Sequence, residues 1–191
     1  PFDLNDIDEI PNWLRILATT DQPLHGLVHS AGVMQIQSIR NIDNDKLNEI
    51  MNINFNAAYS LTRGFRHRKV RAESSSIVFL SSVSGLIGQA GNTAYSASKG
   101  ALISVTRALA MELAREQIRV NCVAPALIQS DIADHMIESL TSEQFQKVED
   151  KHILGFGKID DVANAIAFLL ADTGRWITGT TLVLDGGYTI S

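Results

Sequence analysis

A tyrosine and a lysine stand four residues apart at the start of a predicted helix, in the stretch NTAYSASKGALISVTRALAMELA. Tyr95 and Lys99 therefore share one helix face. Ser82 ends the apolar strand that precedes them, and the loop between the two elements is rich in glycine. A strand end and the first turn of the following helix can bring a hydroxyl beside a phenol. The three residue types indicate proton-transfer chemistry at an oxygen atom.

This trio is suited to acid–base catalysis on a carbonyl or an alcohol. A phenol whose pKa is near ~10 is a poor acid or base at neutral pH, so we expect the ammonium of Lys99 to lower the pKa of Tyr95. The tuned phenol would exchange a proton with a carbonyl oxygen, and the Ser82 hydroxyl would hold that oxygen in place. The carbon also needs a hydride, which a nicotinamide cofactor can supply.

Taken alone, the spacing of Tyr95 and Lys99 is a weak signal, and without its context a structural pair is the better interpretation. A Ser/His/Asp hydrolase is not indicated, because the sequence has no GxSxG motif and no histidine with an obvious place beside Ser82. No cluster of His, Cys and carboxylate residues has metal-ligand spacing, so we expect no metal site.

The composition is that of one globular domain with a hydrophobic core. The sequence has 191 residues, of which 45% are hydrophobic and 19% charged. A net charge of -5 argues against a nucleic-acid partner, and the basic run over 63–71 fits the solvated end of a helix. No apolar run has membrane-spanning length and no signal peptide opens the sequence. Cys122, the one cysteine, cannot form an internal disulfide, so we expect a buried thiol and a cytoplasmic protein.

Strands alternate with helices along the chain. The patterns predict a strand followed by a tight loop within 25–33, a strand over 75–82, a strand within 118–128 that ends at Pro125, and a last strand within 178–189 that is stopped by Gly186 and Gly187. They predict helices over 6–20, 44–66, 94–116 and 160–172. The strands are continuously apolar, which is typical of a parallel sheet covered on both faces. We predict a single doubly wound, Rossmann-like α/β domain over 1–191. Its ligand would lie beyond the carboxyl ends of the strands, where HSAG, SSVSG and APALIQS let a ligand approach the backbone.

Taken together, the motifs resemble those of the classical short-chain dehydrogenase/reductase family. The matching stretches are HSAG (29–32, usually NNAG), MNINF with Asn54, SSVSG with Ser82, YSASK (95–99), VNCVAPALIQS (120–130) and WITGTTLVLDGG (176–187). Ser82 lies thirteen residues before Tyr95, which is the usual spacing in the family. The resemblance extends over nearly the whole chain.

The resemblance implies a role for each matched residue. Tyr95 would be the acid/base and Ser82 the carbonyl-orienting hydroxyl. Lys99 would lower the pKa of the tyrosine and bind the nicotinamide ribose, and Asn54 would hold a proton-relay water. The implied cofactor-binding residues are Asp3, Leu4, Ser30, Ala31, Gly32, Tyr95, Lys99, Pro125, Ala126, Ile128 and Ser130. Asp3 would meet the adenine and Ser130 the carboxamide.

The sequence departs from the family pattern at its start. The family begins with a strand and a TGxxxGxG turn that receives the pyrophosphate, and this sequence has no such motif. Its opening, PFDLND, resembles the segment after the third strand of the family. We therefore expect 1–191 to be the C-terminal three quarters or so of a family-length domain, with the strand over 25–33 presenting a bare apolar edge. Ala126 also stands where the family has glycine, and Ser130 where it has threonine.

Within the family, the motifs are most similar to those of the 3-oxoacyl-[acyl-carrier-protein] reductases. This implies an NAD(P)H-dependent reduction of a ketone to a secondary alcohol, on a free or carrier-bound 3-oxoacyl thioester of fatty-acid or polyketide synthesis. NADP(H) is expected, with NAD(H) as the alternative. A sugar, polyol or steroid alcohol dehydrogenase and an inactive binding or scaffold protein remain open. The resemblance also implies a homotetramer or homodimer that pairs the helices over 44–66 and 94–116, without nucleic acid or membrane partners.

Several other residues have competing interpretations. His29 is either a pH-sensitive group near the cofactor or, as we prefer, a loop residue with one hydrogen bond, and His135 and His152 are predicted at the surface. Trp176 and Tyr188 fit core or subunit contacts better than substrate contacts. The segment over 128–151 resembles the mobile lid of the family, and its apolar side chains would either line a pocket or pack on the core.

Overall fold

The structure, a computed structural model, describes residues 1–18, 22–130, 133, 137 and 140–191. Its four strands form one sheet in the order β1-β2-β3-β4. They are β1 (Leu24–His29), β2 (Arg71–Leu80), β3 (Ile118–Pro125) and β4 (Thr181–Leu184). All three pairings are parallel, which confirms the predicted sheet. The last strand begins at Thr181 rather than at 178 and ends just before the glycines predicted to stop it, where Asp185 accepts hydrogen bonds from Gly187 and Thr189 and turns the chain.

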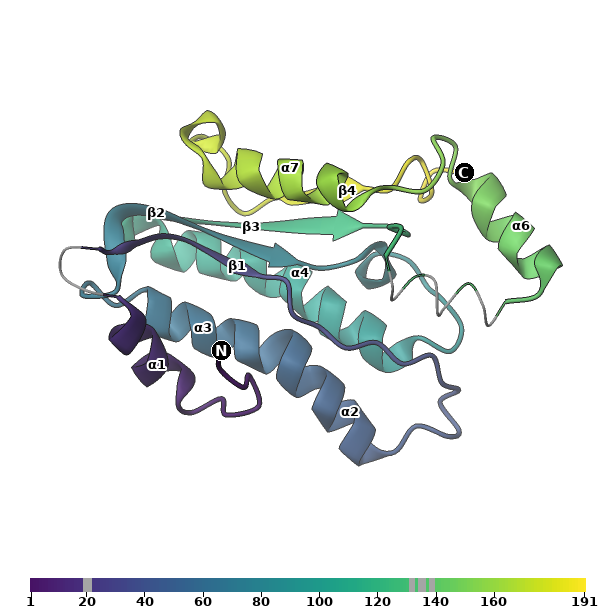
Figure 1. The fold of residues 1–191 in the computed structure, drawn as a ribbon, viewed down its shortest axis with the longest axis horizontal. Helices are drawn as coiled ribbons and strands as arrows, with labels where there is room; N and C mark the ends of the chain where they lie inside the picture. Colours follow the sequence, from purple (N-terminus) through teal and green to yellow (C-terminus); the bar gives the residue numbers. More distant parts are fainter. Residues whose placement is uncertain (19–21, 131–132, 134–136, 138–139) are drawn as a thin grey trace.

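Helices cover both faces of the sheet (Figure 1). One side carries α1 (Ile10–Leu17), α2 (Asn44–Met51), α3 (Ala57–Phe65) and α4 (Thr93–Leu113), and the other side carries α7 (Ile159–Leu170). Along β2, Ile77 and Phe79 belong to the core under α1, α3 and α4, whereas Val78 belongs to the smaller core under α7. The doubly wound architecture is confirmed. A further helix, α6 (Ser142–Lys151), lies beyond the carboxyl end of β3 (Figure 1).

Two helices differ from their predicted bounds. The helix predicted over 6–20 begins only at Ile10, because the preceding residues form turns closed by bonds from Asp6 N to Asp3 O and from Glu9 N to Asp6 O. The helix predicted over 44–66 is interrupted by a π-helical turn, η1 (Asn52–Asn56), which joins α2 to α3. A π turn inserts one residue into the ladder, often at a functional site, and here it contains Asn54.

The first strand lies at an edge of the sheet. Among the described strands, β1 pairs with β2 alone. The side chain of Val28 is 37% exposed beside this edge. An unpaired strand edge presents backbone donors and acceptors that can pair with another chain. The predicted apolar edge is therefore present in the structure.

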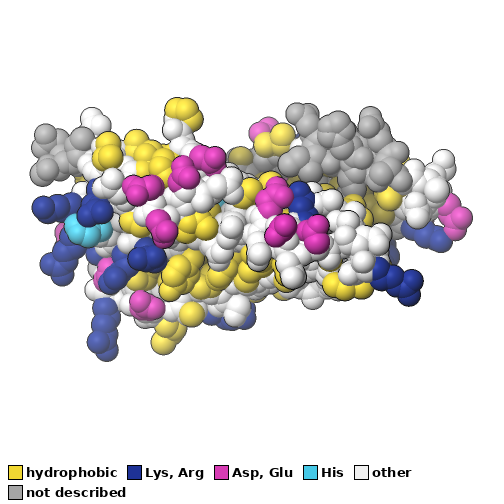
Figure 2. Space-filling model, turned by 90° about the horizontal axis from the view of Figure 1, so that it is seen from below, with side chains coloured by type: hydrophobic (Ala, Val, Ile, Leu, Met, Phe, Trp, Pro, Cys, Tyr) yellow, Lys and Arg dark blue, Asp and Glu magenta, His cyan; other side chains and the backbone are white. Residues whose placement is uncertain are grey.

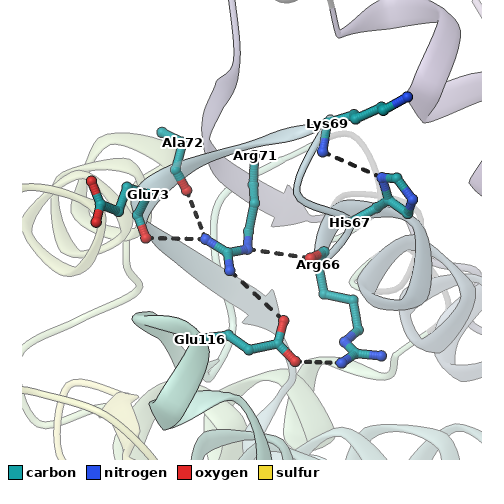
Figure 3. Close-up of polar contacts among 7 residues, drawn as sticks. All are labelled: Arg66, His67, Lys69, Arg71, Ala72, Glu73 and Glu116. Carbon is teal, nitrogen blue, oxygen red and sulfur yellow. Dashed lines mark hydrogen bonds and ion pairs between the residues drawn. The ribbon is translucent and has the colours of Figure 1, made fainter.

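The ends of α3 and α4 are joined through one glutamate, at the end of the molecule away from α6 (Figures 1 and 3). The carboxylate of Glu116, in the turn η3 (Ala114–Glu116), accepts from Arg66 and lies 3.8 Å from Nη2 of Arg71. Arg71 also donates to the backbone carbonyls of Arg66, Ala72 and Glu73. Lys and Arg side chains gather at one end of the face that Figure 2 shows. The residues that follow α3 are exposed, as predicted for a solvated helix end: Arg66, His67, Arg68 and Lys69.

Candidate active site

The segments that follow β1, β2 and β3 meet at one edge of the sheet. The parallel register pairs His29 with Phe79, Leu80 with Val123, and Pro125 with Leu184, so these strands end side by side. Beyond these ends lie three segments: Ser30, Ala31 and Gly32 after β1; Ser81 and Ser82 after β2; and Ala126 onwards after β3. The small residues after β1 are exposed, which leaves their backbone open to a ligand.

Lys99 reaches this edge from the first turns of α4. Its side chain is only 3% exposed, and Nζ donates to the carbonyl oxygen of Leu80 at 2.7 Å. The ammonium lies 5.5 Å from the centroid of the Tyr95 ring, so the two residues do share a face. Burial lowers the pKa of Lys99 to about 8, because a desolvated ammonium facing a neutral carbonyl is poorly stabilised.

The predicted lowering of the Tyr95 pKa is wrong for this structure. Burial raises the pKa of Tyr95 above its ordinary value, and the hydroxyl of Ser82, as a hydrogen-bonding partner, acts in the opposite direction. Burial of the phenol is the main cause of this rise, and no ammonium charge opposes it, because Lys99, with a pKa of about 8, is neutral before Tyr95 ionises. A neutral amine exerts no charge on the phenolate. Ser82 follows β2 at the strand end that the Lys99 side chain also reaches, and its contact with the Tyr95 hydroxyl remains a prediction.

Asn54 connects three elements at the edge. It is fully buried, so the alternative of a solvent-facing residue is excluded. Its Oδ1 accepts from the Val33 N–H at 2.8 Å, and its Nδ2 donates to Val33 O at 3.0 Å and to Ser98 Oγ at 2.9 Å. Ser98 Oγ in turn donates to Tyr95 O. The amide therefore fixes the loop after β1 against α4, and its predicted relay water remains a prediction.

His29, the last residue of β1, is buried against the π turn. Its Nε2 lies 3.2 Å from the backbone oxygen of Asn54, and since a carbonyl only accepts, Nε2 carries the proton. Burial, followed by the charge of Lys99, lowers the pKa of His29 to about 4. The ring is therefore neutral at physiological pH. The predicted single hydrogen bond is present, but the prediction of a loop residue is wrong, because His29 is the buried last residue of β1.

Gly32 lies against both Asn54 and Lys99. A Cβ at this position would be 3.3 Å from Asn54 Oδ1 and 3.3 Å from Lys99 Nζ. The missing side chain keeps a small space open between these polar groups. This space is lined by an exposed backbone and by an ammonium that still has unused N–H donors. It therefore fits the hydroxyl groups of a ribose. The residues present thus fit the sugar of a nicotinamide cofactor.

The loop after β3 is well ordered by hydrogen bonds. Ala126 N donates to Leu184 O at 2.9 Å, and Ile128 bridges to Gly157. Ala126 does not take the left-handed conformation that would require glycine, since Gln117 is the one described non-glycine residue with a positive φ. Ser130 Oγ donates to Ile128 O at 3.2 Å. The substitution of alanine for the family glycine therefore leaves the loop unstrained.

Two residues predicted to bind the cofactor, Asp3 and Leu4, are not in hydrogen-bond contact with the other described residues of the predicted site. Oδ1 of Asp3 accepts from the backbone N–H of Asn5 at 2.9 Å, within its own turn. Leu4 packs against the core under α1 and α3. Their contact with an adenine ring remains a prediction.

Sequence reasoning missed several residues of the site. Ser81 donates to Lys99 O at 2.8 Å, and the Leu80 carbonyl that holds Lys99 is a backbone group with no sequence signal. His152 was predicted at the surface, and this is wrong: it is buried among aromatic rings. The predicted surface position of His135 lies outside the described residues. Trp176 is not a core residue, since it is 92% exposed.

A cavity of about 330 Å³ adjoins the loop after β3. Its lining comprises Ala126, Leu127, Ile128, Leu154, Gly155, Phe156, Gly157, Asp161, Leu184, Asp185 and Gly186. None of the four predicted catalytic residues belongs to this lining. On α6, no described side chain is buried, although Phe145 contacts the ring of Phe156. The cavity therefore lies beside the predicted nicotinamide loop rather than between Ser82 and Tyr95.

None of the helices in the described part of the chain combines the length and apolarity needed to cross a membrane. Within residues 1–18, 22–130, 133, 137 and 140–191, no three His, Cys, Asp or Glu side chains come together as metal ligands would.

Comparison with known proteins gives relatives over almost the full sequence. The family model described as enoyl-(acyl carrier protein) reductase matches residues 1–189. The chain is 30% identical to 3-oxoacyl-[acyl-carrier-protein] reductase FabG of Staphylococcus aureus, over 95% of this chain and 73% of the relative. It is 31% identical to the FabG reductase of Thermotoga maritima, over 100% of this chain and 77% of the relative.

Solved structures agree in fold. A 4-hydroxyisoleucine dehydrogenase complexed with NADH superposes with a TM-score of 0.89 at 29% identity, covering 100% of this chain and 78% of that one. A blue fluorescent protein from a metagenomic library, in complex with NADPH, gives a TM-score of 0.82 at 26% identity, covering 97% and 73%. Because the match extends through every motif at the strand ends, this chain belongs to the short-chain dehydrogenase/reductase family.

Proposed function

We propose that the protein is an NAD(P)H-dependent reductase that converts a ketone into a secondary alcohol. The observation that carries this proposal is the position of Lys99: a buried ammonium beside the Tyr95 ring, at the strand end that also carries Ser82. Burial of an ammonium costs stability, so its place beside the Tyr95 ring supports a role in proton transfer rather than a purely structural one.

The three side chains can each take a different role in the protonation of a carbonyl oxygen. Tyr95, whose pKa is raised, holds its proton throughout the neutral range and so suits the donor role of a reduction. The Ser82 hydroxyl, which acts on the same phenol, can donate a hydrogen bond to the substrate oxygen as charge develops there. Lys99, which is mostly charged below pH 8, would stabilise the phenolate that remains.

The residues present fit a nicotinamide cofactor, which supplies the hydride when bound. Lys99 and the exposed backbone at Gly32 would hold its ribose, and Ser130 its carboxamide. The two solved relatives named above contain NADH and NADPH, respectively, which supports a nicotinamide cofactor. We propose NADPH as the preferred form because reductases of the 3-oxoacyl-[acyl-carrier-protein] group are the proteins that the motifs resemble.

The proposed substrate is a 3-oxoacyl thioester, free or on an acyl carrier. This rests on the two FabG relatives at 30% and 31% identity. The likeness to a 4-hydroxyisoleucine dehydrogenase favours a second candidate, oxidation of another secondary alcohol on the same fold. The family model's description makes an enoyl thioester a third compound to assay. A catalytically inactive binding or scaffold protein remains the alternative that is not an enzyme.

We also propose that the protein is a cytoplasmic homotetramer or homodimer. The outer sides of α3 and α4 leave Tyr59 46% and Met111 82% exposed, and hydrophobic side chains lie across the helical face in Figure 2. Exposed apolar side chains on neighbouring helices support an interface with a second copy. The buried thiol of Cys122 is consistent with a protein that needs no disulfide.

A substrate panel tests the proposal. Oxidation of NADPH and NADH would be followed with acetoacetyl thioester, crotonyl thioester and a simple ketone, and reduction of both cofactors with secondary alcohols. The proposal predicts the highest kcat/KM with NADPH and the 3-oxo thioester, lost in Ser82→Ala. A preference for the crotonyl compound would make it an enoyl reductase. Preference for a free alcohol would favour the second candidate, and no turnover at all would favour the scaffold.

A further inference from the structure

A chain of side-chain contacts begins in the loop between Ser82 and Tyr95. Ser84 Oγ donates to Gln89 Oε1 at 2.8 Å, and Asn92 Nδ2 donates to the same oxygen at 3.1 Å. Gln89 Nε2 donates to Tyr188 Oη at 3.1 Å. Two donors thus meet the amide oxygen and one acceptor faces the amide nitrogen, which fixes the orientation of the Gln89 side chain.

The chain continues from Tyr188 to the end of α6. The rings of Tyr188 and His152 lie with their centroids 4.6 Å apart. Nδ1 of His152 is 2.7 Å from Val148 O, and the backbone N–H of Leu127 donates to Nε2 at 3.4 Å. One neutral tautomer, protonated at Nδ1, satisfies both contacts. His152 therefore ties α6 to the loop after β3, in which Ala126 and Ile128 are predicted to contact the cofactor.

The other end of the chain reaches the predicted catalytic serine. Ser82 caps the short turn η2 (Val83–Gly85), where Ser84 N donates to Ser82 Oγ at 3.2 Å. Ser84 is thus bonded to Ser82 through its backbone and to Gln89 through its side chain. A displacement of Gln89 would move the turn that orients the Ser82 hydroxyl.

The hydrogen bond from Gln89 is not needed to form the turn that carries Tyr188. That turn is closed by Asp185, whose carboxylate accepts from Gly187 N at 3.1 Å and from Thr189 N at 2.8 Å. The hydroxyl of Tyr188 therefore serves the contact with Gln89 rather than its own segment.

We propose that Gln89, Tyr188 and His152 form a positioning link between the loop after β3 and Ser82. Through this link, the position of the loop after β3, which is predicted to contact the cofactor, sets the orientation of the Ser82 hydroxyl. That hydroxyl would hold the substrate carbonyl. The three residues act through Ser84 and the backbone, so they are positioning residues rather than catalytic ones. The kinetic part of the inference rests on the proposed function, whereas its structural part does not.

Kinetics of conservative variants test the link. Tyr188→Phe removes one hydroxyl and keeps the ring contact, and Gln89→Met removes the amide at similar size. We expect Tyr188→Phe to lower kcat for ketone reduction about three- to tenfold, the value of one lost hydrogen bond, with KM changed less than about twofold. Gln89→Met should lower kcat at least as much, because it also loses the contacts with Ser84 and Asn92. The double variant should be no worse than Gln89→Met alone, because that variant already lacks the bond to Tyr188. Lys147→Ala, which breaks only the exposed pair with Glu143 on α6, is the matched control and should leave kcat unchanged.

Hydrogen exchange tests the link without any activity. His152→Phe keeps an aromatic ring and loses both nitrogen contacts, and we expect faster amide exchange over 83–92 in this variant and in Tyr188→Phe. Faster exchange in a protein that turns over no ketone would support the link and overturn the proposed function. Exchange over 83–92 equal to that of the wild type in Tyr188→Phe, or additive losses of kcat in the double variant, would overturn the link.

Discussion

The ammonium of Lys99 is buried beside a backbone carbonyl rather than a carboxylate, and this explains its lowered pKa. The identity and shared face of Tyr95 and Lys99 could be predicted from their spacing. The direction of the Tyr95 shift could not, because it depends on how deeply the phenol is buried and on which group titrates first. Burial depth at a strand end is a tertiary property that a four-residue spacing does not encode.

Lys99→Met should stabilise the chain at neutral pH while removing activity. The unfolded lysine titrates near ~10.4 and the folded one near 8, so below pH 8 the folded state bears the cost of a buried charge. After allowance for the lost bond to Leu80, we expect the variant to be about 1–2 kcal/mol more stable at pH 7.

The difference in unfolding free energy between Lys99→Met and the wild type should become smaller as the pH rises. The wild-type unfolding free energy rises as pH increases from about 8 towards about 10, where the unfolded state still binds the proton. Urea denaturation at both ends of this range should show the gap between wild type and Lys99→Met shrinking at high pH. A constant gap would contradict the lowered pKa.

At the scale of the element, the π turn brings Asn54 to the point where the loop after β1 meets α4. The strand ends could be predicted, since each apolar run closes in small or polar residues. The π turn could not, because Leu47, Ile50 and Leu61 keep a helical period across it. The burial of His152 was missed for a similar reason: it stands in a polar segment, and its partner Tyr188 is distant in sequence.

Asn54→Ala should destabilise the fold more than a change two positions along the same turn. The variant leaves Val33 N–H, Val33 C=O and Ser98 Oγ without this partner, and we expect a loss of about 2–4 kcal/mol. Asn56→Ala, the control, breaks only a bond to Asn52 and should cost less than about 1 kcal/mol. Equal urea midpoints for the two variants would show that the amide of Asn54 does not hold the loop.

At the scale of the whole molecule, the described residues leave the outer edge of β1 unpaired and apolar side chains exposed on the outer side of α3 and α4. The chain corresponds to 73% and 77% of the lengths of the two FabG relatives. The doubly wound topology could be predicted from the alternation of buried strands and helices. The proposed oligomer could not be predicted from that alternation. The sequence pattern does not show that Tyr59 and Met111 stay exposed after α3 and α4 have packed on the sheet.

Charge placed on the outer helical side should dissociate the proposed oligomer. Met111→Glu and Tyr59→Glu bury a carboxylate in any interface that α3 and α4 form, and we expect light scattering to give the monomer mass. Ile39→Glu is the matched control: this residue is 69% exposed in the loop before α2 and should leave the mass unchanged. A wild-type protein that is monomeric at all concentrations would refute the proposal.

The most direct test of the central claim is the turnover of Tyr95→Phe with NADPH and a 3-oxo thioester, with cofactor binding measured on the same sample. The substitution removes only the phenolic oxygen, so the fold and the contact of Lys99 with Leu80 should persist. If Tyr95 is the proton donor, kcat falls by about 10²-fold or more while the cofactor Kd stays near that of the wild type. Turnover equal to the wild-type value would contradict the account.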